Sequence, residues 1–152
     1  MKHRIAFKYL GTNVPYRNAL DLQTRLVEHH WKKGPDAQDI LLLLQHTPTF
    51  TAGRRMKVSG VLTKELGAEY VETKRGGQLT FHGPGQLVGY PILNLKRLNV
   101  GVRCYVEDLQ QILISVCKKY AIDAHTTKDT GVWVDQSRKI AALGKSAIHS
   151  LI

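Results

Sequence analysis

Apolar residues recur at helical spacing near the start of the chain. In residues 15–33, Leu20, Val27 and Trp31 fall on one face of a helix. A proline at the first position suits the first turn, because proline lacks the N–H that this turn leaves unpaired. Gly34, which another proline follows, ends the pattern. We therefore expect a helix over residues 15–33 with those three side chains on one face.

A second and clearer helical pattern covers residues 102–120. Its apolar side chains recur at steps of three and four residues. They are Val102, Tyr105, Val106, Leu109, Ile112, Leu113, Val116 and Tyr120. Cys117 lies on the same stripe, so we expect it to be an inert core residue. Cys104 lies off the centre of the stripe and has no neighbouring base in the sequence, so we expect it to be structural as well.

Strand signals surround these two helices. Residues 5–10 indicate a strand, and the unbroken apolar run in residues 39–46 is typical of a buried one. Shorter strands are expected at residues 68–72, 124–126, 132–135 and 139–143, with a turn at 135–138. Residues 46–55 are expected to form a polar turn, 63–66 a helical turn, and 75–91 a loop, a strand and a loop. The irregular alternation predicts an α+β (mixed α/β) fold with a mainly antiparallel sheet flanked by helices, in one domain over residues 1–152.

Composition narrows the class of protein. With 43% hydrophobic residues in 152, the chain is neither disordered nor collagen-like. Its longest apolar run, residues 40–44, is far shorter than the roughly 20 residues of a membrane span. The net charge of +10 favours an acidic partner, such as nucleic acid, an anionic membrane surface or an acidic protein. A solvated basic surface without such a partner is the alternative.

The cysteines and the N-terminus bear on the compartment. Cys104 and Cys117 form no CxxC motif, which favours a reducing compartment and argues against a zinc site. No secretory signal is visible, because no long apolar stretch follows the first basic residues. The first ten residues are basic and lack acids, which fits a first strand or a very short mitochondrial presequence.

The segment from Arg75 to Gln86 carries the strongest chemical signal. Its four glycines allow the backbone to approach a ligand closely, because no Cβ intervenes. Arg75 offers a cation, and Gln78 and His82 offer hydrogen-bond donors. The segment is neither a P-loop nor a dinucleotide-binding fingerprint. A glycine- and proline-rich hairpin loop with turn duties only is the alternative, just as His82 and His46, each taken alone, are more simply structural histidines.

Lys139 begins an apolar strand of small residues that includes Ala141 and Ala142. A lysine held partly buried there would act as a base or stabilise a thiolate. An edge-strand lysine in solvent is the alternative. Gly144 and the two alanines would leave room for a bound chain, or would simply pack against a helix.

Three sequence blocks together resemble one enzyme family. Residues 75–91, RGGQLTFHGPGQLVGYP, closely resemble the signature of the octanoyltransferases of lipoate biosynthesis, the LipB family. Residues 131–134, GVWV, with 138–144, RKIAALG, look like its second block, and residues 46–54, HTPTFTAGR, like an earlier one. The blocks follow the family order, so the set is far more specific than the glycine-rich loop alone.

The resemblance implies a fold similar to the biotin and lipoate protein ligase catalytic domains. It implies transfer of an octanoyl group from acyl carrier protein to a lysine of a lipoyl domain, through an acyl-enzyme on a cysteine. Lys139 would be the catalytic lysine that lowers the pKa of the thiol and handles the proton of the acceptor amine. The residues implied along the acyl pocket are Arg75, Gly76, Gly77, Gln78, Leu79, Thr80, Phe81, His82, Ala142, Leu143 and Gly144.

The resemblance also implies partners and a compartment. The partners are octanoyl-acyl carrier protein and the lipoyl domains of 2-oxoacid dehydrogenases and the glycine cleavage H protein, with no nucleic acid and no membrane span. Both kinds of partner are typically acidic, which would suit the charge of +10. No cofactor or metal is implied. The protein is expected in mitochondria, or in the cytoplasm if it is bacterial.

The chain departs from the family after residue 144. The family continues with a His-Gly-x-Ala-x-Asn segment and a Pro-Cys-Gly that carries the nucleophile, whereas this sequence continues with KSAIHSLI. Cys104 and Cys117 match no catalytic position. We therefore expect residues 1–152 to be the N-terminal part of such a catalytic domain. The alternatives are a non-catalytic form that only binds octanoyl-acyl carrier protein, and a basic nucleic-acid-binding domain, for which no recognisable motif is present.

Overall fold

The computed structural model describes residues 4–53, 67–73 and 79–144. The chain divides into two compact units, and the boundary falls between Asn94 and Leu95. Each unit is described by itself. The expectation of one domain over residues 1–152 stays a prediction, as does the helical turn at 63–66, which lies outside the described residues.

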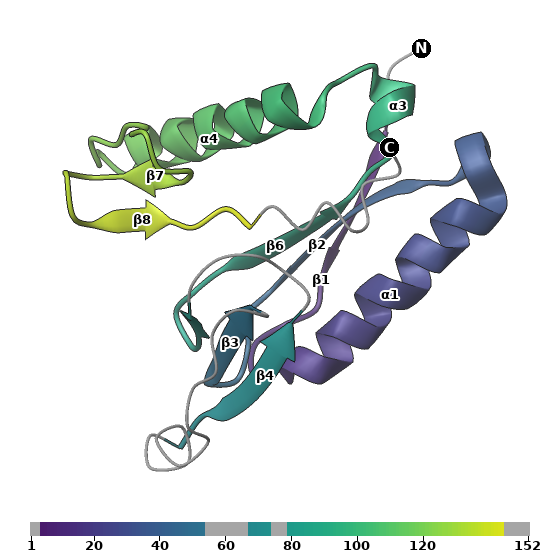
Figure 1. Cartoon of the computed structure of the whole chain (residues 1–152), viewed down its shortest axis with the longest axis horizontal. Helices are drawn as coiled ribbons and strands as arrows, with labels where there is room; N and C mark the ends of the chain where they lie inside the picture. The colour runs from purple at the N-terminus through teal and green to yellow at the C-terminus, as the bar shows by residue number, and fades with distance from the viewer. Residues whose placement is uncertain (1–3, 54–66, 74–78, 145–152) are drawn as a thin grey trace. The chain divides into compact units, whose positions relative to one another are not determined.

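The main sheet of the first unit has three strands in the order β1-β2-β6. They are β1 (Ile5–Tyr9), β2 (Asp39–Leu44) and β6 (Val88–Ile92). β1 runs parallel to β2, which requires a crossover, and the helix α1 (Tyr16–Lys33) provides it (Figure 1). The strands expected at residues 5–10 and 39–46 and the helix expected at 15–33 are confirmed.

Helix α1 buries a stripe that passes through Ala19, Val27 and His30. Val27 packs with Leu42 of β2 in the core of this unit. The expectation that Trp31 shares this face is wrong, because Trp31 is 59% exposed. The stripe advances by three residues from Val27 to His30, which leaves Trp31 at its margin. Gly34 ends the helix with φ of +62°, a conformation that glycine adopts without strain.

A second sheet in this unit has the order β4-β3-β5. Its strands are β3 (Thr49–Gly53), β4 (Glu69–Thr73) and β5 (Thr80–His82). The polar turn expected at residues 46–55 is therefore wrong over Thr49–Gly53. Threonine is β-branched and favours strands, and the buried hydroxyl of Thr49 donates to the carbonyl of Thr47 at 2.9 Å. Polar residues can thus lie inside this sheet because their hydroxyl groups have partners.

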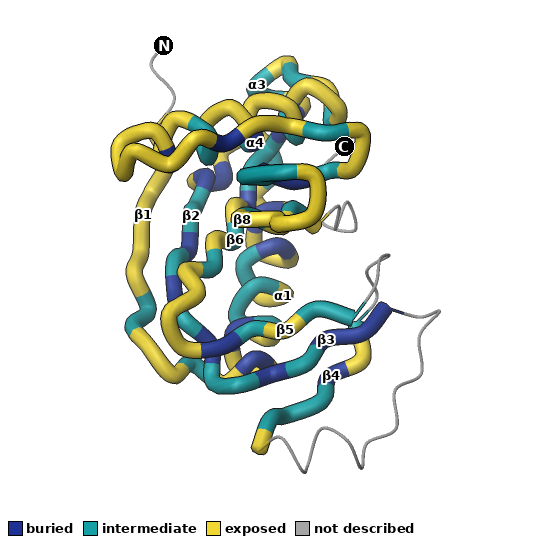
Figure 2. Tube along the Cα trace, turned by 90° about the vertical axis from the view of Figure 1, so that its left-hand side faces the viewer, coloured by how far each residue is buried: buried dark blue, intermediate teal, exposed yellow. Residues whose placement is uncertain are grey.

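Strand β6 replaces the loop expected before residue 91. It pairs antiparallel with the buried strand β2, and a Cβ at Gly89 would lie 3.2 Å from Cδ2 of Leu43. Glycine lets the two strands approach at that point. Pro91 is tolerated because β6 is an edge strand of its sheet, where one row of N–H groups has no ladder partner. At the other edge, β1 is exposed along its length (Figure 2).

The second unit is a long helix packed on a hairpin. It contains α3 (Leu95–Leu98), α4 (Val102–Lys119), β7 (Val132–Trp133) and β8 (Lys139–Ala141). Its core joins Cys117, Ala124 and Val132, which confirms Cys117 as a core residue. The expected helix is confirmed, but three members of its predicted stripe are exposed. They are Ile112, Val116 and Tyr120.

The buried stripe of α4 instead includes a polar residue, Gln110, which is 8% exposed. Gln110 is accommodated because its amide donates to a backbone carbonyl. The strand expected at residues 124–126 is reduced to one bridge between His125 and Trp133. Three of the five strand pairings among the described residues are antiparallel, so the α+β class and the mainly antiparallel sheets are confirmed.

Candidate functional site

The residues implied by the resemblance fall in both units. Leu79 to His82 lie on and before β5 in the first unit, whereas Lys139 and residues 142–144 lie on and after β8 in the second. Arg75, Gly76, Gly77 and Gln78 lie outside the described residues. The convergence of all these residues on one cleft stays a prediction.

Strand β5 divides its candidate residues between two faces, since side chains alternate along a strand. Phe81 lies on one face against Phe50, with ring centroids 5.0 Å apart. A Cβ at Gly83 would lie 2.7 Å from the Phe81 ring, so a larger residue there would displace that ring. Thr80 and His82 lie on the other face. Thr80 and His82 therefore share one face of β5, and their role in an acyl pocket, like that of Phe81, stays a prediction.

His82 belongs to a cluster of aromatic and hydroxyl side chains from four elements. Its ring centroid lies 5.6 Å from that of Tyr16 and 5.7 Å from that of His46. Its Nε2 lies 3.3 Å from Oγ1 of Thr51. The Tyr16 and His46 rings are tilted against each other, with centroids 5.0 Å apart. The first turn of α1, the segment between β2 and β3, strand β3 and strand β5 thus meet around His82.

The hydrogen bonds of His46 fix which nitrogen carries its proton. Nδ1 lies 2.9 Å from the carbonyl oxygen of Val14, which can only accept, so Nδ1–H donates there. Nε2 lies 2.8 Å from the hydroxyl of Tyr90, which must then donate to it. Both nitrogens of this fully buried ring are occupied. His46 is therefore a positioning residue for its neighbours, in keeping with its structural interpretation.

Burial keeps the His46 ring and the Tyr90 hydroxyl in their neutral forms. Burial lowers the pKa of His46, against an opposing effect of the Val14 carbonyl. Burial, and then the neighbouring Tyr16 hydroxyl, raises the pKa of Tyr90 well above its usual range. Sequence reasoning missed Tyr16 and Tyr90. Tyr16 begins the buried stripe of α1, but its role depends on contacts that no local pattern reveals.

Lys139 begins β8, opposite Trp133 in the hairpin. Its Nζ donates to the carbonyl oxygen of Thr130 at 3.0 Å and lies 4.5 Å from the centroid of the Trp133 ring. The side chain is exposed rather than partly buried, as in the alternative of a solvated edge-strand lysine. It nevertheless has two defined partners on the same hairpin.

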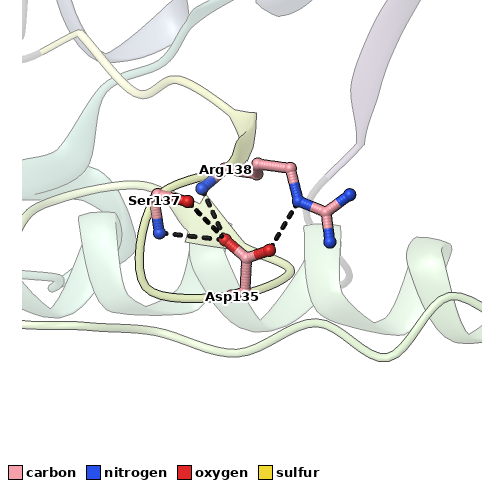
Figure 3. Close-up of polar contacts among 3 residues, drawn as sticks. All are labelled: Asp135, Ser137 and Arg138. Carbon is pink, nitrogen blue, oxygen red and sulfur yellow. Dashed lines mark hydrogen bonds and ion pairs between the residues drawn. The ribbon is translucent and has the colours of Figure 1, made fainter.

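The turn before Lys139 is held by one carboxylate. Figure 3 shows Asp135 accepting from the backbone N–H and hydroxyl of Ser137 and from the backbone N–H of Arg138. Its other oxygen pairs with the Arg138 guanidinium. The Ser137 N–H, and then Arg138, lower the pKa of Asp135 well below its usual range. The turn expected at residues 135–138 is confirmed, and it sets the position at which β8 begins.

The remaining candidates on the second unit follow β8. Ala142 and Gly144 are exposed, and Leu143 is half-buried. In the part of the chain that the structure describes, no heavy atom other than those of its chain neighbours lies within 4 Å of the position that a Cβ of Gly144 would take. Cys104 is an exposed free thiol on α4, and Cys117 is buried. Among the described residues, no group of three His, Cys, Asp or Glu side chains could hold a metal ion, and no helix is long and apolar enough to cross a membrane.

Comparison with known proteins gives one consistent family. Residues 15–150 match the family described as lipoyl protein ligase A/B catalytic domain. The chain is 42% identical over 140 residues to the mitochondrial octanoyl-[acyl-carrier-protein]:protein N-octanoyltransferase of Danio rerio, covering 90% of this chain and 62% of that protein. It is also 42% identical over 142 residues to an octanoyltransferase of Koribacter versatilis, covering 87% of this chain and 56% of that protein. The chain thus spans about 60% of the length of these relatives.

Solved structures support the fold. P. falciparum LipL1 in complex with lipoate superposes with a TM-score of 0.66 at 16% identity, covering 89% of this chain and 42% of that chain. At this identity the likeness concerns the fold alone. The expected similarity to lipoate protein ligase domains is therefore confirmed.

Proposed function

The chain belongs to the lipoyl protein ligase A/B catalytic domain family, and we propose that it forms part of an octanoyltransferase. One observation carries the proposal. The identity of about 40% to octanoyltransferases extends over about 90% of this chain, and the family match over residues 15–150 includes every sequence block described above. Identity at this level, spread over the whole chain, supports a shared reaction as well as a shared fold.

The proposed reaction moves an octanoyl group in two steps. A cysteine thiolate of the enzyme attacks the thioester carbonyl of octanoyl-acyl carrier protein, and the carrier thiolate leaves. The ε-amine of a lysine on a lipoyl domain then attacks the enzyme thioester, loses a proton and releases the cysteine thiolate. The Lys139 ammonium would stabilise the cysteine thiolate before it attacks and would protonate the departing carrier thiolate. The resulting neutral amine of Lys139 would then take the proton of the acceptor amine.

The glycine-rich block would bind the acyl donor. His82 and Thr80 share one face of β5, and His82 lies against the Tyr16 and His46 rings. Such a face combines apolar ring surface with hydrogen-bonding groups, which suits a fatty-acyl thioester. Arg75 and Gln78 would complete this part of the pocket. Phe81 on the opposite face would support it through Phe50.

The charge of the chain supports acidic protein partners. The excess of 22 basic over 12 acidic residues would attract acyl carrier protein and lipoyl domains electrostatically. One solved relative is described as a bi-partite lipoate protein ligase of Thermoplasma acidophilum with its E2 lipoyl domain. In a eukaryote the protein would work in mitochondria, as the name of the Danio rerio relative states for that protein, and in a bacterium in the cytoplasm.

The test is octanoyl transfer by the protein that carries this chain. Octanoyl-acyl carrier protein and an unmodified lipoyl domain are incubated with it, and intact mass reports the gain of one octanoyl group. We expect transfer that falls by about 100-fold or more in Lys139→Arg, because arginine keeps the charge but does not give up a proton. Lys118→Arg, an exposed lysine of α4, is the matched control and should transfer normally.

Substitution of the two cysteines and binding measurements distinguish the proposed function from its alternatives. Cys104→Ser and Cys117→Ser should leave transfer intact, and a hydroxylamine-sensitive octanoyl adduct on either would refute the assignment of the nucleophile elsewhere. Binding of octanoyl-acyl carrier protein without any transfer would favour the non-catalytic alternative. Binding to DNA that collapses steeply with salt would favour the nucleic-acid alternative.

A further inference from the structure

Gly131 leaves the space that the stem of Lys139 occupies. Its φ of +139° lies in the region that favours glycine. A Cβ at Gly131 would lie 3.0 Å from both Cδ and Cε of Lys139, and 2.9 Å from the carbonyl oxygen of Ala141. At such short separations from a Cβ, the neighbouring carbon and oxygen atoms would have to move. A larger residue would therefore push away the lysine stem, strand β8, or both.

The Trp133 indole that faces Lys139 is itself fixed. The backbone of Trp133 exchanges hydrogen bonds with His125 at 2.8 and 2.9 Å. Its indole Nε1 donates to the carbonyl oxygen of Asp129 at 3.2 Å. With backbone and ring both held, the aromatic face occupies one place on the hairpin. The ammonium of Lys139 lies 4.5 Å from the centre of that face, within the range of a cation–π contact.

Helix α4 holds the glycine in place. The side-chain amide of Gln110 donates to the carbonyl oxygen of Gly131 at 2.9 Å in a buried hydrogen bond. This hydrogen bond explains how Gln110, a polar residue, can lie on the buried stripe of the helix, which the apolar pattern does not predict. The bond ties the loop that carries Gly131 to the longest element of this unit.

These contacts fix both the place and the direction of Nζ. Gly131 leaves room for the lysine stem, Trp133 lies beside the ammonium, and the Thr130 carbonyl accepts one of its protons at 3.0 Å. Two of the three substituent positions on Nζ then remain to face other groups. A base must meet its proton donor within about 3 Å, so holding one direction for Nζ matters for proton transfer.

We propose that Gly131 and Trp133 are positioning residues for Lys139, and that they hold its amine in the geometry that proton transfer requires. The proposal rests on the proposed function, in which Lys139 handles the proton of the acceptor amine. Neither residue has to touch the substrate to act in this way. Gln110 supports the arrangement from α4 through the carbonyl of Gly131.

The first test varies the ring in the octanoyl-transfer assay. Trp133→Leu removes the aromatic face and should lower kcat by about tenfold to 100-fold, while KM for octanoyl-acyl carrier protein changes little. Trp133→Phe retains an aromatic face and should restore kcat to within about threefold of the original. Trp31→Leu is the control: it replaces the other tryptophan of the chain, which is exposed on α1, and should leave kcat unchanged.

The second test detects the contact between Lys139 and Trp133 without any measurement of catalysis. In a Trp31→Phe background, Trp133 is the only tryptophan of this chain, so its fluorescence reports on its surroundings. Replacing Lys139 with Met removes the ammonium beside the ring and should shift the emission of Trp133. Lys118→Met, on the exposed side of α4, should leave that emission unchanged.

The two tests separate this proposal from the proposed function. An unchanged emission spectrum in Lys139→Met, or a normal kcat in Trp133→Leu, overturns the positioning role even if octanoyl transfer itself is confirmed. If the protein transfers no octanoyl group, the proposed function fails, and the emission spectra still decide whether Trp133 holds Lys139. Gly131→Ala adds a third comparison wherever the variant folds, and it should resemble Trp133→Leu.

Discussion

Replacing Tyr90 with phenylalanine removes one hydroxyl group from the centre of the first unit. That hydroxyl donates to Nε2 of His46 at 2.8 Å, and His46 is fully buried. The aromatic ring itself is retained, so the loss concerns the hydrogen bonds of the hydroxyl, which also interacts with Tyr16 and Gln23. A buried acceptor left without its donor costs about 1–3 kcal/mol. We expect the free energy of unfolding to fall by about 2 kcal/mol, or the Tm by about 4–8 °C in a chain of this length.

The pH dependence of stability gives a sharper form of the same prediction. Below pH 6.5, unfolded His46 takes up a proton that the folded ring resists because its pKa is lowered, so stability decreases as the pH falls. Above pH 10, unfolded Tyr90 loses a proton that the folded hydroxyl keeps because its pKa is raised, so stability decreases as the pH rises. The Tyr90→Phe variant has no hydroxyl to ionise and therefore lacks this loss of stability above pH 10. The stability curves of the two proteins should therefore converge above pH 10.

The assay is urea unfolding followed by circular dichroism, at neutral pH and again at pH 11. Tyr120→Phe is the matched control, because Tyr120 is 74% exposed and its hydroxyl should contribute nothing measurable. Two results would refute the reasoning. One is a Tyr90→Phe variant as stable as the original protein at neutral pH. The other is a difference between the two proteins that stays constant from neutral pH to pH 11.

Two further predictions concern the cores and the turn before Lys139. Leu44→Ala, at a side chain with no exposed surface, should cost about 2–5 kcal/mol in urea unfolding, whereas Leu87→Ala, at a side chain 64% exposed, should cost less than about 0.5 kcal/mol. Equal costs would contradict the assigned core. Asp135→Ala should lower the protection of the Ser137 amide against hydrogen exchange at neutral pH, because the carboxylate that accepts from this amide is removed. Unchanged protection of that amide would show that the carboxylate does not hold the turn.

The elements that the sequence predicted well are those with a strong local pattern. The two long helices, the buried strand β2 and the turn at residues 135–138 all follow from periodicity or from turn-forming side chains. The errors come from tertiary contacts. Residues 46–55 are mostly polar, yet Thr49–Gly53 within them forms a strand. Strands on both sides pair with it, and the hydroxyl groups of its threonines find carbonyl partners.

The helical stripes show the same limit at the level of single residues. Periodicity assigns Trp31 and Ile112 to buried faces, although both are more than half exposed. His30 and Gln110 are buried in their helices instead, each with a hydrogen bond to a backbone carbonyl. An apolar pattern cannot find a buried polar residue, because burial of such a residue depends on a partner distant in sequence.

Resemblance and geometry contribute different parts of the candidate site. Sequence blocks single out His82 and Lys139 because they belong to recognisable motifs, but they say nothing about what holds these side chains. The structure supplies Tyr16 and Tyr90 around the histidines, and Trp133 beside the lysine. Tyr90 and Trp133 lie inside the blocks at 75–91 and 131–134, and Tyr16 lies outside them, but no block shows which side chains these residues contact. A reactive side chain can thus be identified from its motif, whereas the residues that orient it are identified from their contacts in the folded structure.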